Sequence, residues 1–295
     1  MTFSATEAAF EGFRVVRRNP VAIVFWALAY VICFAAFFGL FAGPLATVMA
    51  TTESLEGTQP SPQEIQALMA SWSSFMVLGL PLSLVLGAVL NAAVARSVLR
   101  PAEKAFGFMR LGGDELRVLA VTVILGIVFF AVTVLLFSVV GVAVGVAGQV
   151  NTGVGILVGV VLGLAAVAVL IWLSVRLSLA VPATFHEKRI SPFATFALTK
   201  GHTLPLLGMA VIAFIMSMLV SILATIVALP VTMATGGLDQ LAALDGQSTA
   251  QILQTAGVGL LAWGAINAIF SALQLAVIYA PFSAAYRELK GLPQD

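Results

Sequence analysis

Six long apolar segments constrain this chain more than any other feature of its sequence. They cover approximately residues 21–48, 71–97, 117–147, 153–181, 204–235 and 252–285. Each exceeds the roughly 20 residues that a helix needs to cross about 30 Å of hydrocarbon. Because lipid offers no partner for backbone amides, such segments cross as helices. The pattern predicts an all-α polytopic membrane protein in which residues 1–295 form one integral membrane domain.

The composition supports a membrane protein. Charged residues make up 9% of the chain, against about 25% in soluble domains. The hydrophilic stretches between the apolar segments are shorter than the roughly 50 residues of a small folded domain. We therefore expect no nucleic-acid partner and no cofactor. Cys33 is the single cysteine, so no intramolecular disulfide can form.

The distribution of charge predicts the orientation. With six crossings, all 14 Lys and Arg residues fall on the side that carries both termini. The charged residues of the opposite side are all acidic: Glu53, Glu56, Glu64, Asp239 and Asp245. Basic loops stay in the cytoplasm, so both termini are predicted to be cytoplasmic.

Three segments before the first, third and fifth crossings resemble one another. They are AFEGFRVVRRNP (9–20), AFGFMRLGGDELR (105–117) and PFATFALTKGHTLP (192–205). Each has two phenylalanines, then a basic residue, then a break that is rich in Gly, Asn, Asp or Pro. We interpret each as an amphipathic elbow helix at the cytoplasmic interface. They favour a three-fold repeat of elbow and hairpin, although any chain with three cytoplasmic entrances would look similar.

Basic residues near these elbows are candidates for binding anionic lipid headgroups, each contributing on the order of 1 kcal/mol. The candidates are Arg14, Arg17, Arg18, Arg110, Arg176 and Lys200. The alternative is that they only set the topology. Arg176 near the end of the fourth segment is expected to extend toward the headgroups.

Two stretches carry a resemblance to a known family. RLSLAVPATFHEKRISPFATFALTKG (176–201) and APFSAAYRELKG (280–291) are similar to the six-helix membrane domain attached to some glycerophosphodiester phosphodiesterases, and to YciC-type bacterial inner-membrane proteins. The resemblance implies the same six-helix fold and a location in the bacterial inner membrane. The phosphodiesterase catalytic domain has no counterpart here, so no catalytic residue is implied.

Polar residues inside the apolar segments are few. Asn267, Ser271 and Gln274 share one face of the sixth segment, at spacings of i, i+4 and i+7. Such a face either forms hydrogen bonds between helices or lines a path for a substrate. The first interpretation favours a packing role, and the second favours a transporter.

Small residues predict close helix packing in the third and fourth segments. Gly155, Gly159 and Gly163 are spaced as GxxxGxxxG, and Gly141 and Gly145 as GxxxG. These faces let helix backbones approach closely. With only GQVNTG (148–153) between them, the two helices are expected to pack as an antiparallel hairpin. Use of the same face in a homodimer is the alternative.

The leading functional hypothesis is a non-enzymatic inner-membrane protein that acts through lipid contacts, or as an accessory or scaffold partner of other membrane proteins or of itself. The first alternative is a transporter or channel for a small or amphipathic solute. The second is a lipid-acting enzyme that uses His186, Glu187 and His202. A zinc site needs three or four ligands, and the chain has only these two histidines, so no metal site is expected.

Overall fold

The computed structural model of the protein describes residues 3–54, 61–236 and 243–293. Within these ranges the secondary structure is helical, with no strand. Six helical segments are long and apolar enough to cross a membrane. They are Pro20–Thr52, Pro62–Leu99, Ala105–Val150, Thr152–Glu187, Thr203–Thr235 and Thr249–Leu289. The predicted all-α polytopic fold is therefore confirmed.

The helices of the first half of the chain are α1 (Ala5–Ala9), α2 (Glu11–Arg18), α3 (Pro20–Ser54), α4 (Pro62–Ser74), the π turn η1 (Phe75–Gly79), α5 (Leu80–Leu99), the 3₁₀ turn η2 (Ala105–Phe108) and α6 (Gly113–Val150). Those of the second half are α7 (Thr152–Leu177), α8 (Ala180–Glu187), the 3₁₀ turn η3 (Pro192–Ala194), α9 (Thr195–Leu198), α10 (Thr203–Thr235) and α11 (Thr249–Leu289).

Prolines explain two differences from the predicted spans, and a third proline leaves its helix intact. The fourth span, expected to reach residue 181, is interrupted after Leu177, because Pro182 has no N–H to donate to the carbonyl of Ser178. In the second span, Pro81 follows the π turn η1, where the missing N–H permits the wider turn. Pro281, by contrast, lies inside α11, which continues to Leu289, beyond the predicted residue 285.

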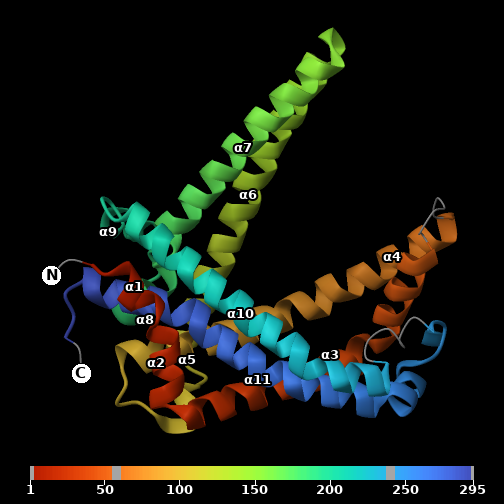
Figure 1. The fold of residues 1–295 in the computed structure, drawn as a ribbon, viewed down its shortest axis with the longest axis horizontal. Coiled ribbons are helices and arrows are strands. Elements are labelled where there is room, and N and C mark those ends of the chain that lie inside the picture. Colours follow the sequence, from red (N-terminus) through yellow and green to blue (C-terminus); the bar gives the residue numbers. More distant parts are fainter. Residues whose placement is uncertain (1–2, 55–60, 237–242, 294–295) are drawn as a thin grey trace.

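Helix α11 is the centre of the molecule. It packs against α2, α3, α5 and α10, and small residues such as Ala276, Ala280 and Ala284 are buried along it. The largest buried cluster joins these residues to Trp26 of α3 and Leu206 of α10. The two termini lie at the same end of the molecule, beside α1, α8 and α9 (Figure 1).

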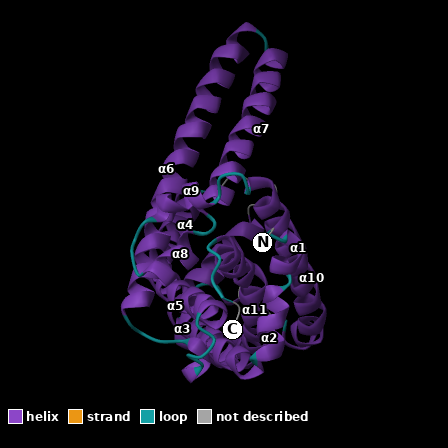
Figure 2. Ribbon diagram, turned by 90° about the vertical axis from the view of Figure 1, so that its left-hand side faces the viewer, coloured by secondary structure: helices purple, strands orange, loops and turns teal. Residues whose placement is uncertain are grey.

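The hairpin of α6 and α7 projects away from the other long helices, as both views show (Figures 1 and 2). Its two helices pack mainly on each other, and α6 contacts α5 and α8 near its beginning. Asn151 is the N-cap of α7, and its side-chain oxygen accepts a 2.7 Å hydrogen bond from the Gly153 N–H. The predicted antiparallel hairpin is therefore present, but it is joined to the rest of the fold only at its base.

The predicted elbows differ in structure. The first is a regular helix, α2, and it packs so closely on α11 that a Cβ on Gly12 would lie 2.5 Å from Cα of Val277. The second is the single turn η2, in which Phe106, Gly107 and Phe108 have positive φ angles. It is held to α3 by the indole of Trp26, which donates a 2.7 Å hydrogen bond to the Gly107 carbonyl. An amphipathic helix was the wrong expectation for this segment, because left-handed residues cannot continue a helix.

Two of the glycines that were predicted to pack the hairpin lie at the contact between α6 and α7. A Cβ on Gly155 would lie 3.0 Å from Cα of Gly148, and one on Gly159 would lie 3.1 Å from Cγ2 of Val144, so both are at the α6–α7 contact. A Cβ on Gly141, Gly145 or Gly163 would meet no atom of the described residues within 4 Å beyond its own helix backbone. The tight contacts of the hairpin at the predicted glycines are therefore those of Gly155 and Gly159.

Candidate functional site

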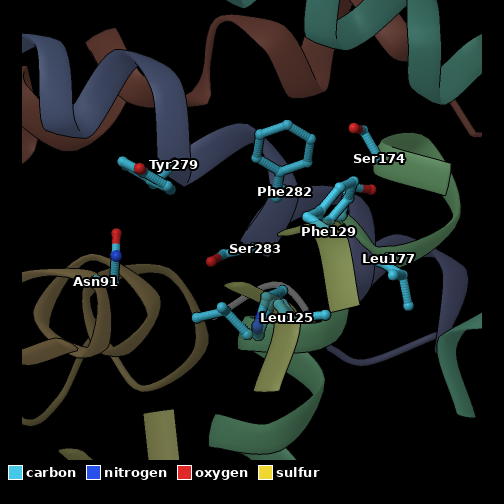
Figure 3. Close-up of a pocket in the computed structure, with 11 residues that line it drawn as sticks. Asn91, Leu125, Phe129, Ser174, Leu177, Tyr279, Phe282 and Ser283 are labelled. Atoms are coloured by element: carbon cyan, nitrogen blue, oxygen red, sulfur yellow. The ribbon is translucent and has the colours of Figure 1, made fainter. Parts of the chain in front are cut away.

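A cavity of about 460 Å³ lies at the base of the projecting hairpin, where it joins α5, α8 and α11. Its walls come from five helices. The lining residues are Asn91, Leu125, Phe129, Ser174, Leu177, Ser178, Val181, Pro182, Tyr279, Phe282 and Ser283. Figure 3 shows Asn91, Tyr279 and Ser283 on one side of the space, with Phe129, Ser174 and Leu177 on the other. The lining is mostly apolar, with a few polar groups.

The polar groups of the cavity differ in whether they already have a hydrogen-bond partner within the protein. The hydroxyl of Ser174 donates to the Leu170 carbonyl and that of Ser178 donates to the Val175 carbonyl, each at 2.8 Å. The side-chain oxygen of Asn91 is buried and has no hydrogen-bond partner among the described residues. A buried acceptor without a partner costs free energy. A ligand that donates a hydrogen bond here would remove that cost.

The position of the cavity suits an amphiphile. Asn91 precedes the end of α5 at Leu99 by about 12 Å at the helical rise of 1.5 Å per residue. The cavity therefore lies close to the end of the molecule that carries both termini. Its apolar walls fit a hydrocarbon chain, and Asn91 fits a hydroxyl or amino group.

A buried ion pair joins the hairpin to the rest of the fold, nearer the end of α5 than the cavity-lining Asn91. Arg96 of α5 and Glu115 of α6 are 1% and 5% exposed, and their Nη2 and Oε1 atoms are 2.5 Å apart. Arg96 also donates to the Phe108 carbonyl, and its Nε lies 3.6 Å from Glu103. The pair thus ties α5, η2 and the beginning of α6 together.

A second layer of contacts extends this network to α8. Arg100 pairs with Asp114 at 3.2 Å, and Arg117 pairs with the same carboxylate at 2.9 Å. The guanidinium of Arg100 lies over the ring of Phe185, 4.7 Å from its centre, and that of Arg96 lies 5.2 Å from the same ring. Cations over an aromatic face are attracted by its quadrupole. These contacts set the position from which the hairpin projects.

Five of the six predicted lipid-binding cations fall into two groups, and Arg176 is described separately below. Arg14 and Arg18 pair with Glu11 at 3.2 and 3.7 Å, and Arg110 pairs with Glu103 at 2.9 Å. Arg17 and Lys200 are exposed, and the described residues offer them no ion pair. They are not gathered into one site, since they lie on different elbows.

Arg176 makes contacts within the protein. Its Nη1 donates to the Thr199 hydroxyl at 3.2 Å, and its guanidinium lies 5.2 Å from the centre of the Phe196 ring and 5.7 Å from that of Trp172. The arginine therefore holds the third elbow against α7. Thr195 completes the joint by donating to the Arg176 carbonyl at 3.0 Å.

The residues of the enzyme hypothesis are engaged in structural contacts. The Glu187 carboxylate pairs with Lys290 at 2.8 Å and accepts from the Tyr286 hydroxyl at 3.1 Å. The ring of His186 packs on Tyr286, with 5.7 Å between ring centres. His202 lies between α9 and α10, and no recorded contact joins it to the other two. In the described part of the chain no three His, Cys, Asp or Glu residues are grouped as metal ligands.

The polar face of α11 lies away from the cavity. Asn267 donates a 2.9 Å hydrogen bond to the Trp263 carbonyl of its own helix. Asn267, Ser271 and Gln274 are partly buried, and none of them lines the cavity at the base of the hairpin. The α11 residues that do so are Tyr279, Phe282 and Ser283, which the sequence analysis did not single out.

The Arg96–Glu115 pair was likewise not predicted from the sequence. A signal was present, because residues 96–117 place Glu103, Asp114 and Glu115 among five basic residues on the side expected to be basic. Acidic residues there work against the topology signal and indicate internal pairing.

Comparisons of the chain with models of protein families, curated proteins and solved structures give no match. The family resemblance therefore stays a prediction.

Proposed function

We propose that this is a non-enzymatic membrane protein that acts by binding a lipid-like amphiphile at the base of its projecting hairpin. The observation that carries the proposal is the 460 Å³ apolar cavity with the unpartnered Asn91 oxygen. Ligand sites are commonly mostly apolar, with a few polar groups that fix the orientation. The ligand class is an amphiphile with a hydrocarbon chain and a hydrogen-bond donor near its polar end.

The proposal includes a location in the inner membrane of a bacterium, with both termini in the cytoplasm. Its support is the presence of all 14 basic residues on one side of a six-crossing chain. The cavity then lies in the cytoplasmic leaflet, where an amphiphile would enter from the lipid beside the hairpin.

The test is native mass spectrometry of the protein extracted gently from its own membrane. We expect the wild type to retain an amphiphile that Ser283→Leu, which fills the cavity, does not retain. Asn91→Leu removes the acceptor and should weaken retention about fivefold, the equivalent of one net hydrogen bond of ~1 kcal/mol.

A matched control is Ser221→Leu, the same substitution on an exposed position of α10. It should retain the amphiphile as the wild type does. Equal retention by Ser283→Leu and Ser221→Leu would contradict the proposal.

A scaffold role is the second candidate. The α6 face with Gly141 and Gly145 would offer a close approach to the backbone of another helix, since among the described residues nothing beyond their own helix backbone lies within 4 Å of a Cβ placed there. A defined protein partner that is lost on Gly145→Leu would favour this function over amphiphile binding. The transporter hypothesis depends on the face of Asn267, which this cavity does not reach.

A further inference from the structure

A second recess at the same end of the molecule brings together cations from three separate parts of the chain. It has a volume of about 340 Å³. Arg18 is the last residue of α2, Lys104 precedes η2, and Arg287 is in the last turn of α11. Glu11 is the only carboxylate among the residues that line it. These residues are far apart in the sequence, so the recess is a product of the tertiary fold.

The single carboxylate is already neutralised. Glu11 is 3% exposed, and it pairs with Arg14 at 3.2 Å and with Arg18 at 3.7 Å. Lys104 is exposed, and no ion pair is recorded for it among the described residues. Arg287 also lines a smaller adjoining hollow that holds the carboxylates of Glu7 and Glu288. The uncompensated charge of the recess is therefore positive and belongs mainly to Lys104.

Arg287 is only partly satisfied by the protein. Its Nη1 donates to the Val98 carbonyl at 3.2 Å. The positive guanidinium therefore lies at the C-terminal end of α5, where the helix dipole carries a partial negative charge. Its Nε is buried and has no hydrogen-bond partner in the described part of the chain. A buried guanidinium N–H without an acceptor favours an anionic oxygen, because charged hydrogen bonds are the stronger ones.

We infer that the recess formed by Arg18, Lys104 and Arg287 binds a phosphate group. Arginine forks match phosphate oxygens, and a lysine adds a mobile point charge. The phosphate belongs either to an anionic lipid headgroup at the membrane surface or to a soluble phosphate compound. The site is separate from the amphiphile cavity, since the two share no lining residue.

The test uses the full-length protein in nanodiscs with two probes. In the first arm, native mass spectrometry measures binding of phosphatidylglycerol from nanodiscs of phosphatidylglycerol and phosphatidylcholine. In the second arm, inorganic phosphate is added to nanodiscs of phosphatidylcholine alone, and the thermal unfolding midpoint is followed. Lys104→Gln should weaken binding about fivefold, the effect expected for one surface cation.

Arg189→Gln is the matched control, because Arg189 is exposed at the same end of the molecule and lies outside the recess. Loss in the first arm identifies a lipid headgroup, and loss in the second identifies a soluble phosphate. Binding that falls equally in Lys104→Gln and Arg189→Gln, or in neither, overturns the proposal. Arg287→Gln should reproduce the loss; if it fails to fold, Lys104→Gln carries the test alone.

Discussion

At the scale of single residues, the Arg96–Glu115 ion pair is the most deeply buried of the ion pairs between described residues. Two opposite charges are 1% and 5% exposed at the junction of α5 and α6. Each would be costly alone in this environment, and together they compensate each other. Their burial explains why acidic residues occur in a segment whose topology signal requires basic ones.

Glu115→Gln should therefore destabilise the protein strongly. It leaves Arg96 buried without its main counter-charge, which costs about 3–5 kcal/mol in comparable sites. The free energy of unfolding, measured by titration with dodecyl sulfate in mixed micelles, is the readout.

Glu103→Gln is the control, because Glu103 is 35% exposed at its side chain and lies 3.6 Å from Arg96. An exposed pair contributes about 1 kcal/mol or less. The double variant Arg96→Met with Glu115→Leu should recover most of the lost stability, since it removes both charges. A Glu115→Gln protein as stable as the wild type would disprove this role.

At the scale of elements, the α6–α7 hairpin shows how one glycine face can bring two helices together while others stay free. Gly155 and Gly159 lie at the contact, whereas a Cβ on Gly141, Gly145 or Gly163 would meet no atom of the described residues within 4 Å beyond its own helix backbone. Both kinds of position share the same sequence spacing. The spacing alone therefore does not identify which glycines lie at the contact.

Gly155→Leu should force the two helices apart, because a Cβ there already lies 3.0 Å from backbone atoms of Gly148 that cannot give way. Overpacking of this kind costs about 1–3 kcal/mol. Gly163→Leu is the matched control, since its Cβ would meet nothing within 4 Å. The free energy of unfolding should fall for Gly155→Leu and stay unchanged for Gly163→Leu. A fall for Gly163→Leu alone would contradict the assignment of Gly155 to the contact between α6 and α7.

At the scale of the whole molecule, the long helices pair as α3 with α4, α6 with α7 and α10 with α11. The hairpin of α6 and α7 diverges from the other long helices (Figure 1). The divergence is compatible with a membrane, because lipid can cover the exposed apolar side chains of the hairpin. Both proposed sites lie where the pairs converge, and both are built from residues of several helices.

The proposed orientation makes a direct prediction for labelling in intact cells. In a Cys33→Ala background, Gln63→Cys and Gln149→Cys should react with an impermeant maleimide from outside. Thr6→Cys and Arg189→Cys, at the end with the termini, should react only after permeabilisation. All four positions are exposed on the structure. Labelling of Thr6→Cys in intact cells would invert the topology.

The sequence by itself determined the number of crossings, the helical class and the difference in charge between the two ends. These properties depend on the length, hydrophobicity and flanking charge of each segment, which are local features of the sequence. The beginning of α4 is likewise a local feature, since Ser61 caps the helix and Pro62 occupies its first turn.

Only the tertiary structure decided which faces pack, where the hairpin projects and which polar groups meet. In a soluble protein the apolar face of a helix predicts what is buried, but in lipid the exposed and buried faces are equally apolar. For this reason Gly141 could not be distinguished from Gly155 in sequence. Asn91 and Ser283, or Lys104 and Arg287, become neighbours in a site only because α11 crosses beside α5, and no local pattern records that crossing.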